Sequence, residues 1–214
     1  ATKSGGGFGD SRINIRGFDQ KNIAVLINGV PVNDMENSSV YWSNWAGLSD
    51  VTSAMQVQRG LGSSKLAISS VGGTINVVTK TSDMKEGGSV STGFGNANYL
   101  KVQASYNTGL LKNGLSASVL LSSTTGDGYV DGTNFEGKNY FIALGYKAND
   151  KHDLQFTFTG APQWHNQRST NITLDTYLKY GSNGEPNTRY NSDWGYLNGE
   201  QFNMKRNFYH KPVA

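Results

Sequence analysis

The chain has 214 residues, a formal net charge of +3 and no cysteine. This length can form one or two domains, each with its own core, and the lack of cysteine excludes disulfides and thiolate metal sites. The charge is mild and no basic run interleaves with aromatic residues, which argues against a nucleic-acid partner.

The hydropathy pattern contains no candidate membrane helix. The longest apolar run, Ile23 to Ile27, is far shorter than the ~18 residues that such a helix needs. Strands that cross a membrane alternate instead of forming a long apolar run, so a soluble fold and a membrane barrel both remain open. The chain starts at Ala1 without a signal peptide, so we expect a mature or truncated product.

The first 81 residues carry short, irregularly spaced strand candidates, separated by glycine-rich and polar loops. The candidates are residues 13–16, 23–27, 55–59 and 74–79. This spacing predicts a small α+β domain with a mostly antiparallel or mixed sheet.

From residue 87 onward the pattern becomes regular, because apolar and polar residues alternate. Five strands are predicted, near residues 88–95, 99–108, 114–124, 139–148 and 152–161. Each has close to the ~9–11 residues that cross a bilayer when the strand is tilted. One face of this set is apolar, with Leu100, Val102, Leu115, Val119, Ile142, Leu144, Phe156 and Phe158.

Such alternation fits a soluble antiparallel sheet that packs on a core, or an outer-membrane barrel whose apolar face meets lipid. The connections favour the barrel, because the long segments 124–138 and 162–214 fall at one end and short turns at the other. Tyr106 and Tyr146 would lie at the short-turn end, as an interfacial aromatic girdle requires. Five strands cannot close a barrel, so we expect an incomplete one, with extracellular long segments.

Catalytic motifs are weak. Residues 60–65 lack the spacing of a phosphate loop, and Ser82 to Lys85 fits S-x-x-K without its companion motifs. We therefore predict no enzyme, no cofactor and no metal. The carboxylates Asp127, Asp131 and Glu136, with Asn134, could hold calcium, but their spacing favours a solvated loop.

Two groups of residues in the first domain suggest contacts. Tyr41, Trp42 and Trp45 lie in a polar segment and form either a local hydrophobic cluster or a stacking surface for a ligand. Arg16 and Arg59 each end a strand candidate and precede a glycine. An arginine there offers a planar fork to a carboxylate, or is simply exposed at a turn.

An ordered set of motifs resembles the plug domain of TonB-dependent outer-membrane receptors. The motifs are Ile15-Arg16-Gly17-Phe18, Val25-Leu26-Ile27-Asn28-Gly29-Val30-Pro31, Leu48-Ser49-Asp50-Val51, Val57-Gln58-Arg59-Gly60 and Gly72-Gly73-Thr74-Ile75-Asn76-Val77-Val78-Thr79-Lys80. The resemblance implies a small α+β plug domain over residues 1–82. Antiparallel strands of an incomplete transmembrane β-barrel, with extracellular loops, would follow over residues 83–214.

The family resemblance also implies a function: active uptake of a nutrient across the outer membrane of a Gram-negative bacterium. The ligand would bind at the extracellular face, and the TonB complex would act on the plug through a segment upstream of Ala1. Outer-membrane lipid would surround the barrel, and the resemblance allows a surface lipoprotein as a further partner. A non-transporting barrel that serves as an assembly subunit or adhesin is the alternative. A secreted β-rich enzyme is a third, and it would need a convergent catalytic set.

The resemblance places two kinds of site on the plug. Arg16 and Arg59 would lie at the plug–barrel interface and pair with glutamates of barrel strands outside this chain. Two apical loops, residues 18–21 and 32–47, would contact the ligand. The expected ligand-binding residues are Phe18, Asp19, Gln20, Asn33, Asp34, Tyr41, Trp42 and Trp45.

Overall fold

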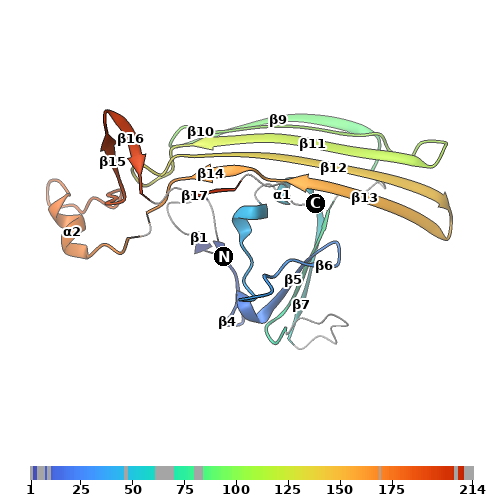
Figure 1. The fold of residues 1–214 in the computed structure, drawn as a ribbon, viewed down its shortest axis with the longest axis horizontal. Coiled ribbons are helices and arrows are strands. Elements are labelled where there is room, and N and C mark those ends of the chain that lie inside the picture. The colour runs from blue at the N-terminus through green and yellow to red at the C-terminus, as the bar shows by residue number, and fades with distance from the viewer. Residues whose placement is uncertain are drawn as a thin grey trace.

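The computed structural model describes residues 2–3, 8, 11–45, 48–60, 70–79, 84–168, 170–204 and 207–209. Residues up to 79 form a small domain, and most of the later residues form a long, curved sheet, here called the large sheet. Figure 1 shows the small domain lying against one face of the large sheet. None of the helices in these residues has the length and apolar character needed to cross a membrane.

The small domain is built on a mixed sheet in the order β6-β5-β8-β7. Its strands are β5 (Ile23–Ile27), β6 (Val30–Pro31), β7 (Thr52–Arg59) and β8 (Gly73–Thr79). β5 pairs with β8 in parallel, and β7 pairs with β8 in antiparallel register. The predicted mixed sheet is therefore confirmed.

The apolar run of β5 explains why this strand is central. Its first four residues are buried, and Ile23 and Val25 join Val40, Ile75 and Val77 in one core cluster. The turn into β6 uses Asn28 (φ 51°) and Gly29 (φ 81°), the Asn-Gly pair that a tight hairpin with positive φ at both central residues favours.

Shorter elements surround this sheet. They are β1 (Thr2–Lys3), β2 (Ser11–Arg12), β3 (Asn14–Ile15), β4 (Phe18–Asp19), η1 (Gln20–Asn22), η2 (Trp42–Trp45) and α1 (Leu48–Val51). The strand predicted at 13–16 is reduced to β3, because Arg16 (φ 52°) and Gly17 (φ 81°) turn the chain toward β4.

The large sheet is antiparallel throughout. Its long strands are β9 (Gly87–Gly95), β10 (Tyr99–Asn107), β11 (Leu115–Gly126), β12 (Phe135–Asn149) and β13 (His152–Gly160). Each pairs with the next along the chain, and the five predicted strands are confirmed.

Two sequence predictions about this sheet are wrong. β11 and β12 extend into residues 124–138, so the loop between them is only 127–134. The segment 162–214, predicted to be a long extracellular loop, contains β14 (Gln163–His165) and β17 (Asn207–Tyr209), which continue the sheet. β14 keeps the register of β13 along β12, and the interruption coincides with Pro162, which has no N–H to donate.

Antiparallel order assigns every connection to one end of the large sheet. The loop end carries residues 96–98, 127–134 and the excursion 166–204, and the turn end carries 108–114 and 150–151. The excursion contains α2 (Leu174–Lys179) and the hairpin of β15 (Trp194–Leu197) and β16 (Glu200–Asn203). Figure 1 shows these elements projecting beyond the sheet.

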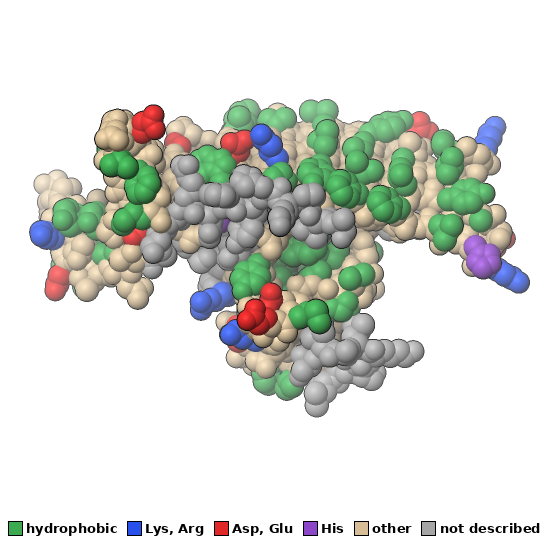
Figure 2. Space-filling view, viewed as in Figure 1, with side chains coloured by type: hydrophobic (Ala, Val, Ile, Leu, Met, Phe, Trp, Pro, Cys, Tyr) green, Lys and Arg blue, Asp and Glu red, His purple; other side chains and the backbone are tan. Residues whose placement is uncertain are grey.

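The two faces of the large sheet differ as the alternation predicts. Seven of the eight apolar residues expected on the outer face are at least 38% exposed, and Phe158 is half-buried. Tyr106 and Tyr146 are also exposed, near the turn end. Figure 2 shows hydrophobic side chains distributed along the large sheet. On the opposite face, Leu120 and Phe141 are buried against the small domain.

Candidate functional site

The two predicted apical loops lie next to each other in the structure. The first comprises β4 and η1, where Asp19 caps η1 by accepting a hydrogen bond from the Gln20 amide at 2.6 Å. The second runs from residue 32 to η2, and the Trp42 indole donates to Gln20 Oε1 at 3.4 Å. Figure 1 shows β4 on the side of the small domain nearer the loop end.

Asn33, one of the predicted ligand contacts, holds the loop in place through its side chain. Its side chain is only 8% exposed. Its Oδ1 accepts from the Val25 amide at 2.7 Å, and its Nδ2 donates to the carbonyls of Ile23 and Ser38 at 2.9 and 3.0 Å. A side-chain amide with both ends bonded to backbone fixes the loop to β5.

Asp34 stabilises the turn that follows. Its Oδ1 accepts from the amides of Glu36 at 2.9 Å and Asn37 at 3.0 Å, the local pattern that makes aspartate common in turns. The turn leaves Met35 fully exposed at its tip. The sequence reasoning did not select this residue. A methionine between two acidic turn residues was its signal.

The three aromatic residues divide between the two interpretations left open. Trp42 and Trp45 are half-buried and pack against the core of the small domain, so they form a local hydrophobic cluster. Tyr41 is 40% exposed, and its hydroxyl accepts a hydrogen bond from Asn37 Nδ2 at 2.8 Å. Together with Phe18, which is 39% exposed, it leaves aromatic surface available on this side of the domain.

The two arginines lie at turns, with exposed side chains. Arg16 stands in the β3–β4 turn, and Arg59 ends β7 opposite Gly73. A Cβ on Gly73 would come within 2.4 Å of the Gln58 carbonyl oxygen, so only glycine fits there. The ion pairs found among the described residues do not involve either arginine. Their pairing with barrel strands outside this chain stays a prediction.

A contact that the sequence reasoning missed joins the small domain to the large sheet. Asp50 of α1 forms an ion pair with Lys101 of β10, with 2.5 Å between Oδ1 and Nζ. Val51 is buried against Leu120 and Phe141. The sequence carried a partial signal, because Leu48 to Val51 was one of the family motifs, but its partners lie at least fifty residues away.

The loop end carries an outer loop cluster, defined as residues 127–134 and 166–204. Arg189 Nε lies 3.1 Å from Asp131 Oδ1, and the Asn191 amide donates to the Asp131 carbonyl at 2.8 Å. Gln201 Nε2 donates to Asn134 Oδ1 at 2.6 Å. These bonds tie the two segments together.

The calcium alternative gains no support. Asp127 accepts from Asn134 at 2.8 Å, Asp131 pairs with Arg189, and Glu136 pairs with Lys138 at 3.2 Å. Amide and cationic partners thus occupy the carboxylates that were considered as ligands. Within the part of the chain that the structure describes, no group of three acidic or histidine side chains could hold a metal ion.

Known proteins share this arrangement. Residues 1–74 match the family model of the TonB-dependent receptor plug domain. The vitamin B12 transporter BtuB of Vibrio vulnificus (strain CMCP6) is 25% identical over 194 residues, which cover 86% of this chain and 29% of that protein.

Solved structures agree in fold. The ferric-catecholate import receptor Fiu of E. coli K12, in its closed form, superposes with a TM-score of 0.62 at 17% identity, over 81% of this chain and 24% of that one. The pyoverdine receptor FpvA of Pseudomonas aeruginosa PAO1 gives 0.58 at 15% identity, over 82% and 25%. The siderophore receptor PiuA of Acinetobacter baumannii gives 0.56 at 17% identity, over 78% and 22%. The chain therefore spans less than a third of the length of these relatives.

Proposed function

We propose that the chain is a segment of a TonB-dependent receptor, with the plug domain followed by the first antiparallel strands of the barrel, and that the whole protein imports a nutrient across the outer membrane. The small domain is the plug, with a boundary near residue 82. The large sheet is part of the barrel wall, and its apolar outer face meets lipid.

One observation carries this proposal. The plug lies against the inner face of an antiparallel wall whose opposite face exposes apolar side chains along several neighbouring strands. Exposing so many neighbouring apolar side chains to water is unfavourable. The hydrocarbon region of a membrane is the environment in which such a face is stable. A domain that fills the lumen of such a wall blocks passive diffusion, so import requires energy to move it.

We place the ligand on the apical side of the plug. Phe18, Tyr41 and Met35 offer exposed apolar surface there, and Asp19, Gln20 and Asp34 provide polar groups at the edges of the same two loops. Trp42 and Trp45 attach these loops to the core of the small domain, against which both side chains pack. Aromatic faces suit sugars, peptides and planar chelates alike. The named relatives transport or bind vitamin B12, a ferric catecholate and pyoverdine, which makes cobalamins and ferric siderophores the first compounds to test.

The test is energised uptake by the full-length receptor. Cells that lack their own cobalamin and siderophore receptors would express it, and accumulation of labelled cyanocobalamin and of a panel of iron-labelled siderophores would be followed. We expect accumulation of at least one compound, and its loss when TonB is deleted. A compound that binds but does not accumulate in cells with TonB would contradict transport and favour the non-transporting alternative.

A further inference from the structure

One side chain of the plug, Phe8, fills a site on the inner face of the wall. Its ring stacks on Phe135, with 4.3 Å between ring centroids and 7° between ring planes, and forms a T-shaped contact with His165 at 5.9 Å. A Cβ on Gly137 would come within 3.1 Å of the Phe8 ring. The missing side chain of Gly137 therefore leaves the room that the ring occupies.

Strand pairing and hydrogen bonds hold the wall residues of this site in place. Phe135 pairs with His165, and Gly137 pairs with Gln163, between β12 and β14. The imidazole Nδ1 of His165 donates to Gln163 Oε1 and its Nε2 accepts from Gln167 Nε2, each at 2.8 Å, because an amide oxygen only accepts and an amide nitrogen only donates. These bonds do not involve the plug, so the site is preorganised. It is called the ring site here and comprises Phe135, Gly137, Gln163 and His165.

A donor in the ring site has no partner. Gln163 is 3% exposed, and its Nε2 is buried without a hydrogen-bond partner among the described residues. Its Cβ lies 3.6 Å from the position that a Gly137 Cβ would take, beside the space that Phe8 fills. The hydrocarbon ring of Phe8 offers no acceptor, and an unpaired buried donor is unfavourable. A ring of similar size that carries an oxygen acceptor would suit the site better than Phe8 does.

The ring site lies at the end of the wall from which the proposed ligand would arrive. Phe135 begins β12 and His165 ends β14, so both lie at the loop end. Phe8 is only half-buried, which leaves its ring open to approach. Its neighbours in the sequence, Gly7 and Gly9, have no side chains. Withdrawal of the Phe8 ring would therefore pull no adjacent side chain out of a packed position.

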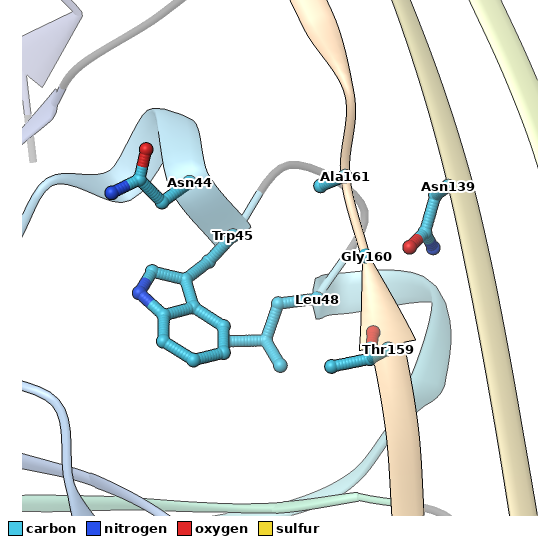
Figure 3. Close-up of a pocket in the computed structure, with 7 residues that line it drawn as sticks. All are labelled: Asn44, Trp45, Leu48, Asn139, Thr159, Gly160 and Ala161. Carbon is cyan, nitrogen blue, oxygen red and sulfur yellow. The ribbon is translucent and has the colours of Figure 1, made fainter. Parts of the chain in front are cut away.

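A cavity farther along the wall is too small for a ring. Figure 3 shows it between Trp45 and Leu48 of the plug and residues 159–161 of the wall. Its volume of about 10 Å³ is close to what a single water molecule needs. An aromatic group would thus fit the ring site and not this cavity.

We propose that the ring site is a subsite for a planar aromatic ring of the ligand, and that Phe8 occupies it in the resting receptor. The ligand ring displaces Phe8, stacks on Phe135 and accepts a hydrogen bond from Gln163 through a ring oxygen. This inference rests on the proposed uptake function and names the class of compound within it, namely chelates with oxygen-bearing aromatic rings.

Binding to the purified full-length receptor tests the displacement. The probes are a ferric tris-catecholate and, as the control without aromatic rings, an aliphatic ferric tris-hydroxamate. Phe8→Ala should tighten binding of the catecholate about tenfold, because the Phe8 ring no longer competes for the site. Binding of the hydroxamate should not tighten by more than about twofold. If Phe8 only fastened the plug to the wall, its removal would give no gain. Unchanged or weaker catecholate binding in Phe8→Ala would overturn the proposal, as would a lack of catecholate binding in both proteins.

A wall variant tests the hydrogen bond. Gln163→Leu should weaken catecholate binding about tenfold. Gln155→Leu is the matched control, because it makes the same change on β13, away from the ring site, and should alter binding by less than about twofold. Hydrogen exchange of residues 135–149 checks that β12 stays paired in both variants. Equal affinities of the wild type and Gln163→Leu would also count against the proposal.

These measurements need no TonB. Failure of the predicted binding pattern would leave the uptake proposal standing for compounds without such rings. A receptor that shows the pattern but accumulates nothing in cells with TonB would contradict transport and leave the ring site standing.

Discussion

Asn33 and Asp34 are adjacent polar residues in a predicted ligand loop, but their side chains have different structural roles. Asn33 points inward and bonds the backbone of β5, while Asp34 points along the turn and organises it. The sequence could not separate these roles, because burial of one residue depends on how the loop folds back over Ile23 and Val25. The direction of each side chain is the information that only the structure supplied.

The buried amide leads to a stability prediction. Asn33→Ala removes the partners of the Val25 amide and of two carbonyls, and we expect it to destabilise the plug by about 2–3 kcal/mol. Asp34→Ala, which removes only local turn bonds, should cost about 1 kcal/mol or less. Urea-dependent hydrogen exchange of residues 23–32 in the full receptor measures both. Equal effects would mean that Asn33 is not the structural member of the pair.

The aromatic residues give opposite expectations for binding and stability. Tyr41→Ala should weaken ligand binding by about 1–3 kcal/mol and change plug stability by no more than ~0.5 kcal/mol, because its ring is exposed. Trp45→Ala should instead destabilise the plug by about 2–3 kcal/mol, since it opens a gap beside the core. Binding is measured as the dissociation constant of the transported compound, once that compound is identified. The stability of the plug is measured by hydrogen exchange. Unchanged affinity in Tyr41→Ala would remove it from the proposed site.

The plug arginines remain predictions with a direct test. If Arg16 and Arg59 pair with wall carboxylates in the full barrel, Arg16→Lys and Arg59→Lys should each loosen the plug, because lysine cannot form the two parallel hydrogen bonds of a guanidinium. Faster hydrogen exchange of residues 11–19 and 52–59, respectively, would report the loosening. Wild-type exchange and uptake in both variants would show that these side chains do not lock the plug.

At the scale of elements, the sequence predicted what periodicity and turn chemistry control. The β9 to β13 strands follow from alternation, and the β5–β6 hairpin from Asn28-Gly29. The sequence prediction failed where strand pairing, and not the local residue pattern, determines the structure. β14 is only three residues long, which is too short to show a periodic pattern. It forms a strand because it pairs with β12, and its own composition does not predict this. The contact of α1 with the large sheet was also missed, because its partners come from strands much later in the chain.

The outer loop cluster should behave as one unit. Arg189 pairs with Asp131, and its guanidinium carbon lies 5.8 Å from the centroid of the Tyr129 ring. Arg189→Ala should therefore loosen the attachment of the 166–204 segment to the 127–134 loop. The pair is partly exposed, so the cost should be modest, about 1 kcal/mol or less. Limited proteolysis of intact cells should cleave the variant faster within residues 166–204. Lys179→Ala, on exposed α2, serves as the control. Equal cleavage of both variants would argue against a braced cluster.

At the scale of the whole molecule, the two ends of the large sheet differ. The plug sits on one face of the wall, its apical loops and the outer loop cluster lie toward the same end, and the short turns lie at the other. On this asymmetry we propose that the loop end faces the cell exterior and the turn end faces the periplasm. It connects the proposed ligand side of the plug with the end from which a nutrient would arrive.

Site-specific thiol labelling tests this orientation, on which the uptake account depends. Glu200→Cys lies in the hairpin of the outer loop cluster, and Asp150→Cys lies in the short turn between β12 and β13, where the aspartate side chain is fully exposed. Both would be introduced into the full-length receptor lacking other accessible thiols, and intact cells would be treated with a membrane-impermeant maleimide. We predict that position 200 reacts in intact cells and position 150 only after the outer membrane is permeabilised. Labelling of position 150 in intact cells, or protection of position 200, would contradict an outer-membrane wall with this orientation.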